Sequence, residues 1–174
     1  IDGRHRPAAD ALKDWGLSHR FAGAGDRAAI GNIVYDALRR RRSAAWLLDE
    51  DTSRARAFGA LLLEGGMDAQ ALNAGLDGDR FAPVPLSEDE LALAGTRVLA
   101  DAPHAVRADC PDWCVPLFVK AFGEGWIEEA AALSERPPLD LRVNTLKADR
   151  QKTLHALNGA GAEPSPIMPT GIRV

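Results

Sequence analysis

Four consecutive arginines, residues 39–42, are the feature of the sequence best suited to binding chemistry. A guanidinium group binds phosphate oxygens through paired N–H donors, so a dense run of them can hold nucleic acid. Arg39, Arg40 and Arg42 are expected to reach solvent, whereas Arg41 falls near the apolar stripe of a predicted helix. Two interpretations stay open, an RNA-phosphate contact and a solvated face paired with neighbouring acids.

The two cysteines, Cys110 and Cys114, are spaced four residues apart and could supply half of a structural zinc site. The histidines are scattered, and only His104 lies near the pair in sequence. We therefore interpret the cysteines as reduced, metal-free thiols that pack as small apolar side chains. Two cysteines do not make a disulfide framework, which favours a cytoplasmic location.

Signatures of catalysis are missing from the sequence. It contains no phosphate-binding loop, no Gly-x-Gly-x-x-Gly turn after a strand, and no defensible Ser/His/Asp or paired-carboxylate arrangement. The glycine-rich stretch at residues 23–26 could bind an anion but fits an ordinary helix start better. We predict no catalytic residue, no bound cofactor and no metal in these 174 residues.

Composition and charge describe an ordinary soluble chain with an uneven charge distribution. Hydrophobic residues make up 46% and charged residues 26%, and no apolar run approaches the roughly 18 residues of a membrane span. Residues 1–56 hold 11 Lys and Arg against 8 Asp and Glu, and the remainder holds 10 against 17. A basic end on an acidic body favours one oriented contact over general adhesion to nucleic acid. The chain does not begin with Met, so we expect it to start inside a longer protein.

Apolar residues at helical spacing dominate up to residue 136. The first such segment follows Asp26, read as an N-cap, and predicts about six helical turns through Leu48. A capping box is predicted at Ser87 and Glu90. Further helices are predicted from Thr52 or Ser53 to Gly65, from Asp68 to Leu76, from about Pro111 to Gly123, and from Trp126 to Ser134.

The periodicity changes after a double proline at residues 137–138. Leu139, Leu141 and Val143 alternate with polar residues, which predicts a half-buried strand. A helix over 147–158 and a second strand at 171–174 follow. Two strands and one helix cannot bury a sheet, so we expect a truncated domain. The predicted fold class is mainly α, with a helical bundle over 1–105, a helical connector over 106–136 and the start of a small β-α-β domain over 137–174.

Three segments resemble the Sun/Nop family of bacterial 16S ribosomal RNA cytosine-5 methyltransferases. Residues 26–42 are similar to its "DR…I…VY…LRRR" helix, and Cys110 to Trp113 with Phe122-Gly123 looks like its "P-x-W … FG" helix. The most specific match is residues 136–147, RPPLDLRVNTLK, which is similar to the "PPL-x-LRVN-x-LK" segment that precedes the methyltransferase domain. The resemblance is spread over most of residues 7–174.

The resemblance implies a helical RNA-binding domain similar to the antitermination factor NusB, a small α+β domain, and then a Rossmann-like domain that binds S-adenosylmethionine. In that last domain one cysteine attacks C6 of the target cytosine and a second helps release the product. Cys110 and Cys114 match neither motif, so no catalytic role passes to them. The implied partners are ribosomal RNA and the chain's own C-terminal methyltransferase domain.

The chain is therefore expected to bind and position RNA for a methyltransferase without being catalytic itself. The alternatives are a stand-alone NusB-like RNA or protein adaptor and a helical protein-interaction scaffold. The RPPLDLRVNTLK segment argues against the adaptor, because an adaptor has no need of a truncated α+β start after the bundle. The candidate RNA-contacting residues are Arg39, Arg40 and Arg42, which are expected to carry much of the RNA affinity, and, as second-tier candidates, Arg142 and Lys147.

Overall fold

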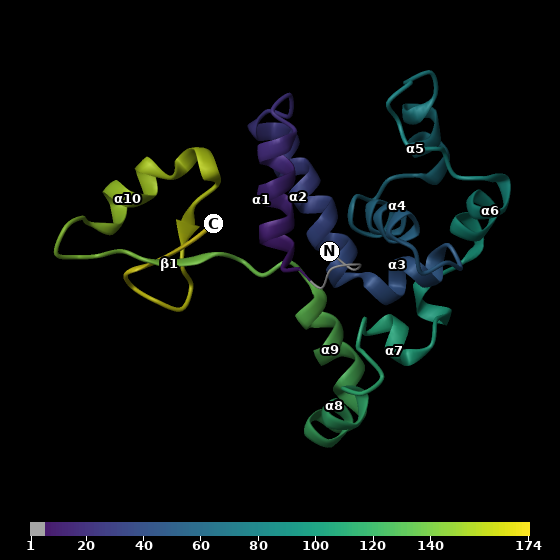
Figure 1. The fold of residues 1–174 in the computed structure, drawn as a ribbon. Helices are drawn as coiled ribbons and strands as arrows, with labels where there is room; N and C mark the ends of the chain where they lie inside the picture. The colour runs from purple at the N-terminus through teal and green to yellow at the C-terminus, as the bar shows by residue number, and fades with distance from the viewer. Residues whose placement is uncertain (1–5) are drawn as a thin grey trace. The chain divides into compact units, whose positions relative to one another are not determined.

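A computed structural model describes residues 6–174, which divide into two compact units after Glu135. We call the described residues up to Glu135 the helical unit and Arg136–Val174 the sheet unit. The first five residues of the predicted 1–105 domain lie outside the described residues. The fold is mainly α with a small α+β part (Figure 1), which confirms the predicted fold class. Along the described chain, no helix is both long and apolar enough to cross a membrane.

Helix α4 (Ser53–Glu64) is the centre of the helical unit, because two preceding helices pack on it. Thr52 caps it as predicted, its hydroxyl accepting the Ala55 N–H at 3.1 Å. A Cβ on Gly59 would lie 2.5 Å from the Ala44 carbonyl oxygen, so only glycine permits the approach of α3 to α4. The two helices that pack on α4 are α2 (Ala24–Arg39) and α3 (Arg41–Leu47).

The prediction of one six-turn helix from Asp26 to Leu48 is wrong. The backbone leaves helical geometry at Arg40, with φ −93° and ψ 29°, which separates α2 from α3. Asp26 is also not the N-cap: it lies in the first turn of α2, and its carboxylate accepts the Gly23 N–H at 2.8 Å. The break creates a second helix N-terminus, whose free N–H groups find an acceptor far along the chain.

Helix α1 (Ala8–Ser18) precedes the first helix that the apolar pattern predicts. Its stripe is short, which explains why periodicity missed it. An ion pair between Arg6 and Asp14 at 2.8 Å spans its first turns. At its end the His19 ring stacks on Trp15 with 4.6 Å between centroids.

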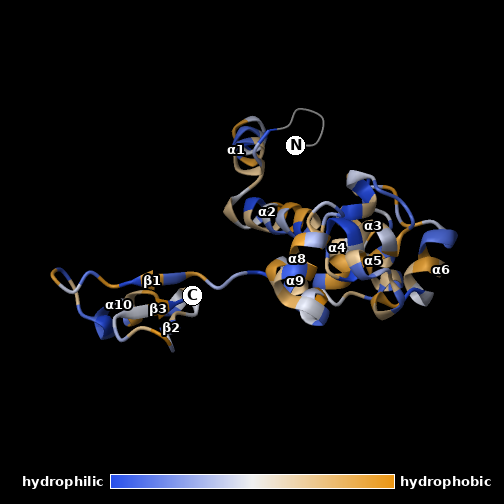
Figure 2. Cartoon of the chain, turned by 90° about the horizontal axis from the view of Figure 1, so that it is seen from below, coloured by the Kyte–Doolittle hydropathy of each residue, from blue (hydrophilic) through white to orange (hydrophobic). Residues whose placement is uncertain are grey.

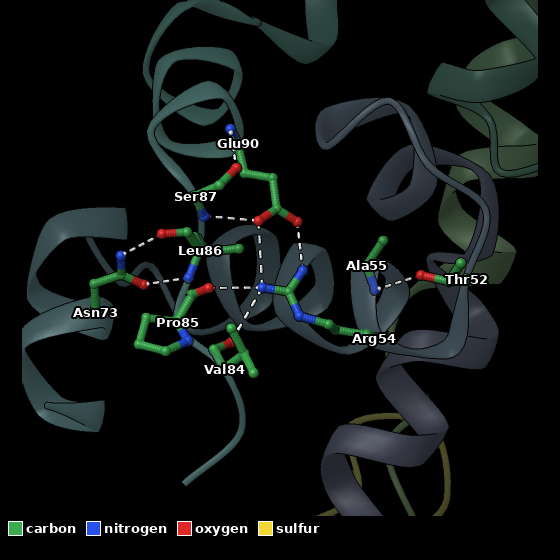
Figure 3. A network of polar contacts seen from close by, with 9 residues as sticks. All are labelled: Thr52, Arg54, Ala55, Asn73, Val84, Pro85, Leu86, Ser87 and Glu90. Atoms are coloured by element: carbon green, nitrogen blue, oxygen red, sulfur yellow. Dashed lines mark hydrogen bonds and ion pairs between the residues drawn. The ribbon is translucent and has the colours of Figure 1, made fainter. Parts of the chain in front are cut away.

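Hydrogen bonds tie the irregular chain before α6 (Glu88–Thr96) to its neighbours (Figure 3). The predicted capping box is confirmed: Glu90 N donates to the Ser87 hydroxyl, and Ser87 N donates to the Glu90 carboxylate at 2.8 Å. Arg54 of α4 forms an ion pair with Glu90 and donates to the carbonyl of Pro85 at 2.9 Å. Asn73 exchanges two 2.8 Å hydrogen bonds with the Leu86 backbone.

Two apolar clusters form the core of the helical unit, whose helices carry both hydrophobic and hydrophilic residues (Figure 2). One cluster joins α4 to α5 (Ala69–Leu76) and α6 through Phe58 and Leu86. The other surrounds Trp126 and includes Cys110. Its helices are α7 (His104–Arg107), α8 (Val115–Phe122) and α9 (Trp126–Ser134). The helix predicted from about Pro111 begins later, because residues 111–114 form a turn.

The sheet unit is a three-stranded antiparallel sheet in the order β1-β3-β2 with one helix. Leu141 pairs with Ile172, which is fully buried. The strands predicted near 139–143 and 171–174 are confirmed, although β1 is exposed along its whole length. The short β2 was not predicted. The elements are β1 (Asp140–Arg142), α10 (Arg150–Ala156), β2 (Glu163–Pro164) and β3 (Gly171–Arg173).

Candidate nucleic-acid interface

The N-terminus of α3 is capped by Asp109, a residue that follows α7. The Asp109 carboxylate accepts the Arg42 N–H at 2.9 Å, the Ser43 N–H at 2.8 Å and the Ser43 hydroxyl at 2.6 Å. Its side chain is completely buried, and its backbone has a φ of 45°. Burial raises the pKa of Asp109 above its ordinary value, although the hydrogen bonds from Ser43 and Arg42 oppose the rise.

Arg40 and Arg42 extend this junction with their side chains. Arg40 forms an ion pair with Glu64 and lies 3.8 Å from the Asp109 carboxylate. Arg42 Nη1 donates to the Cys110 carbonyl at 2.7 Å and to the Asp112 carboxylate at 2.6 Å. Both guanidinium groups therefore hold the segment after α7 against α3.

The other two arginines of the run are paired as well. Arg39 Nη2 lies 2.6 Å from the Asp36 carboxylate, and Arg41 Nη2 lies 3.5 Å from that of Asp51. Arg41 is the most exposed of the four side chains, although the sequence pattern placed it nearest the apolar stripe. All four arginines therefore lie beside acidic side chains. An RNA contact by Arg39, Arg40 or Arg42 stays a prediction.

Cys110 and Cys114 are both free thiols in this region. Burial raises the pKa of the Cys110 thiol, which keeps it protonated and poorly nucleophilic. Within the described part of the chain, no three His, Cys, Asp or Glu side chains gather where they could hold a metal ion. The packing of Cys110 beside Trp126 accords with the role of a small apolar side chain.

Arg142 and Lys147 differ from the arginine run, because both are exposed. Among the residues that the structure describes, neither side chain has an ion-pair or hydrogen-bond partner. Arg142 ends β1 and lines an open pocket of about 490 Å³ together with residues 143–146 and Thr170. Lys147 closes the turn at the rim of that pocket, its backbone N–H donating to the Asn144 carbonyl at 2.9 Å.

Charge is divided between the two units. The sheet unit, residues 136–174, contains six Lys and Arg against three Asp and Glu, a net charge of +3. Residues 1–135 contain 15 against 22, a net charge of −7. As a whole unit, only the smaller one is net positive, which favours the attraction of a polyanion to it.

The part of the chain that contains Arg142 and Lys147 is similar to a domain of known proteins. Residues 110–174 match the model of the ferredoxin-like domain of RsmF/B-like methyltransferases. These residues are similar to that domain of the methyltransferase family. The match confirms the resemblance drawn from the RPPLDLRVNTLK segment, whereas the arginine run lies outside the matched residues.

A curated methyltransferase is also similar to part of this chain. The ribosomal RNA small subunit methyltransferase B of Photorhabdus laumondii is 35% identical over 66 residues. The aligned stretch covers 37% of this chain and 15% of that relative. The match therefore compares a small part of the relative with this chain, and the activity of the whole relative does not pass to it directly.

Two features of this region were not predicted from the sequence. Asp109 gave no signal, because its partner Ser43 is 66 residues away. The turn at residues 144–146 could have been predicted, since Asn favours Asx-turns, in which its side chain accepts the N–H two residues on. The Asn144 carboxamide oxygen does accept the Leu146 N–H, at 3.1 Å.

Proposed function

We propose that this chain binds and positions RNA for an S-adenosylmethionine-dependent ribosomal RNA cytosine-5 methyltransferase. The observation that carries the proposal is the match of residues 110–174 to a domain of RsmF/B-like methyltransferases. The ribosomal RNA methyltransferase of Photorhabdus laumondii, similar to 66 residues of this chain, supports it. The helical domain at 1–105, the connector at 106–136 and the NusB-like character of the former belong to the same proposal.

The chemistry of methyl transfer is assigned to a further domain of such an enzyme. A nucleotide-type cofactor is held where a parallel strand, a glycine-rich turn and a helix meet. The strands of the described residues form an antiparallel sheet, which does not fit S-adenosylmethionine. The chain's own residues therefore contribute binding and orientation of RNA and no step of the reaction.

The five candidate contacts fall into two groups. Arg142 and Lys147 are proposed as the main phosphate contacts, because they are exposed and the described residues leave them unpaired. Arg39, Arg40 and Arg42 are proposed as secondary contacts, because a phosphate would have to compete with their acidic partners.

A direct binding measurement tests this function. The 174-residue chain is titrated into a labelled ribosomal RNA hairpin at about 50 mM and about 200 mM salt. RNA binding that weakens steeply with salt supports the proposal, and a silent titration contradicts it in favour of a protein-interaction scaffold. An isothermal titration with S-adenosylmethionine is expected to give no heat, because its binding domain is assigned elsewhere.

An exposed apolar group on α8 supports the proposed contact with a methyltransferase domain. Trp113 is 74% exposed, and Leu117 and Phe122 of α8 are 61% and 48% exposed. Exposed aromatic and aliphatic side chains are typical of protein contact surfaces. If the chain were instead a stand-alone adaptor, added methyltransferase domain would not bind it.

A further inference from the structure

The turn at residues 144–147 presents one apolar side chain between two cations. Leu146 is 95% exposed, with Lys147 directly after it and Arg142 at the end of the preceding strand. The Asn144 carboxamide oxygen accepts the Leu146 N–H at 3.1 Å, and the Asn144 carbonyl accepts the Lys147 N–H at 2.9 Å. These two hydrogen bonds fix the turn and leave the Leu146 side chain exposed to solvent.

The turn is anchored to the core of the sheet unit on one side and opens onto a pocket on the other. Val143 is buried, and its N–H donates to the Thr170 carbonyl at 2.9 Å. Thr145 and Thr170 line the pocket beside Leu146, together with Asn144. Hydroxyl and amide groups of this kind bond to ribose hydroxyls and to the edges of exposed bases.

We propose that the 144–147 turn binds single-stranded RNA, with Leu146 packed against a nucleobase and the two cations on the flanking phosphates. This inference rests on the proposed RNA-binding function and names the form of RNA recognised. A single strand alternates apolar base faces with phosphates, which matches Leu146 placed between Arg142 and Lys147. A duplex stacks its base faces inside and would leave Leu146 in water. The net charge of +3 on the sheet unit favours an anionic occupant over a neutral or basic protein, and the alternation of base faces with phosphates favours RNA among the anionic ones.

Fluorescence anisotropy with the full chain tests the inference. The probes are a labelled single-stranded RNA of about 12 nucleotides and the same strand annealed to its complement. We expect several-fold tighter binding of the single strand. Leu146→Ala should weaken single-strand binding about fivefold or more with an unchanged salt slope, because a base contact releases no counterions. Lys147→Gln should instead reduce that slope by about 0.7.

Two further variants separate a base contact from a general apolar effect. Leu133→Ala removes a leucine that is 74% exposed in the helical unit and should leave both affinities unchanged. Leu146→Phe offers a larger flat face to a base and should equal or exceed the unaltered chain in affinity. Because Leu146 lies in water, its variants should melt at the same temperature as the unaltered chain.

The outcomes distinguish this inference from the function on which it rests. If the unaltered chain binds RNA and Leu146→Ala binds equally well, the base contact is overturned and the RNA-binding function stands. Equal affinity for single strand and duplex also overturns it. If the unaltered chain binds neither probe, the proposed function itself fails, and the inference fails with it.

Discussion

Asp109 caps helix α3 from 66 residues away, its carboxylate accepting both the N–H and the hydroxyl of Ser43 at 2.8 and 2.6 Å. Ser43 is completely buried, and so is the Asp109 side chain. Arg40 lies 3.8 Å from the same carboxylate and supplies compensating positive charge. The break in helical geometry at Arg40 frees the N–H groups of Arg42 and Ser43, and the Asp109 carboxylate accepts both.

Replacing the cap is therefore expected to destabilise the helical unit. Asp109→Ala leaves two α3 N–H groups without their acceptor and removes the 2.6 Å acceptor of the Ser43 hydroxyl, which should lower the free energy of unfolding by about 2 kcal/mol or more. Chemical denaturation measures the loss. Asp101→Asn changes an exposed carboxylate and serves as the control, and equal stability of the two variants would contradict the capping role.

A second prediction concerns the contact between α3 and α4. Gly59→Ala would place a Cβ 2.5 Å from the Ala44 carbonyl oxygen and 2.7 Å from its Cα, so the helices must move apart. Overpacking of this kind should destabilise the chain by about 1–3 kcal/mol. Gly31→Ala in α2 meets nothing within 4 Å and should instead raise stability by about 0.5–1 kcal/mol. A lower melting temperature for Gly59→Ala together with a higher one for Gly31→Ala would confirm the close approach of α3 and α4. Changes of the same sign in both variants would refute it.

Local patterns predicted some elements, and long-range partners decided the rest. The capping box at Ser87 and Glu90 could be predicted because both partners lie in one helical turn. The strands near 140 and 171 could be predicted from alternating side chains. The break at Arg40 could not, since the carboxylate that accepts the N–H groups at the start of α3 belongs to Asp109, 66 residues beyond Ser43. Of the candidate site, the residue types were visible in sequence, but their pairing was not. Only the structure separates Arg40 and Arg42 from Arg142 and Lys147, for which residues 6–174 supply no partner.

The ion pair between Arg54 and Glu90 predicts a pH dependence. Burial alone would raise the pKa of Glu90, but the Arg54 side chain and the Ser87 N–H together lower it below its ordinary value of 4.5. A lowered folded-state pKa contributes stability above pH 4.5 that is lost as the pH falls through the folded value. Glu90→Gln should cost about 1–2 kcal/mol at neutral pH, and the difference from the unaltered chain should shrink in acid. A constant difference across that range would exclude Glu90 as the titrating group.

The final prediction separates the arginine run from the free cations of the sheet unit. Arg142→Gln with Lys147→Gln should weaken RNA binding and make its salt dependence shallower by about 1.4, because two phosphate contacts are lost. The melting temperature should not change, since both side chains are exposed and the described residues hold no partner for either.

The matched variant in the helical unit, Arg40→Gln with Arg42→Gln, should behave in the opposite way. It removes the ion pairs to Glu64 and Asp112 and the hydrogen bond to the Cys110 carbonyl, so the free energy of unfolding should fall by about 2–4 kcal/mol. RNA affinity, measured below its melting temperature, should change little. Lys120→Gln, an exposed lysine of α8, controls for the loss of one positive charge. If the Arg40 and Arg42 variant keeps its stability and loses RNA binding, the run contacts RNA directly and the ranking of the two groups is reversed.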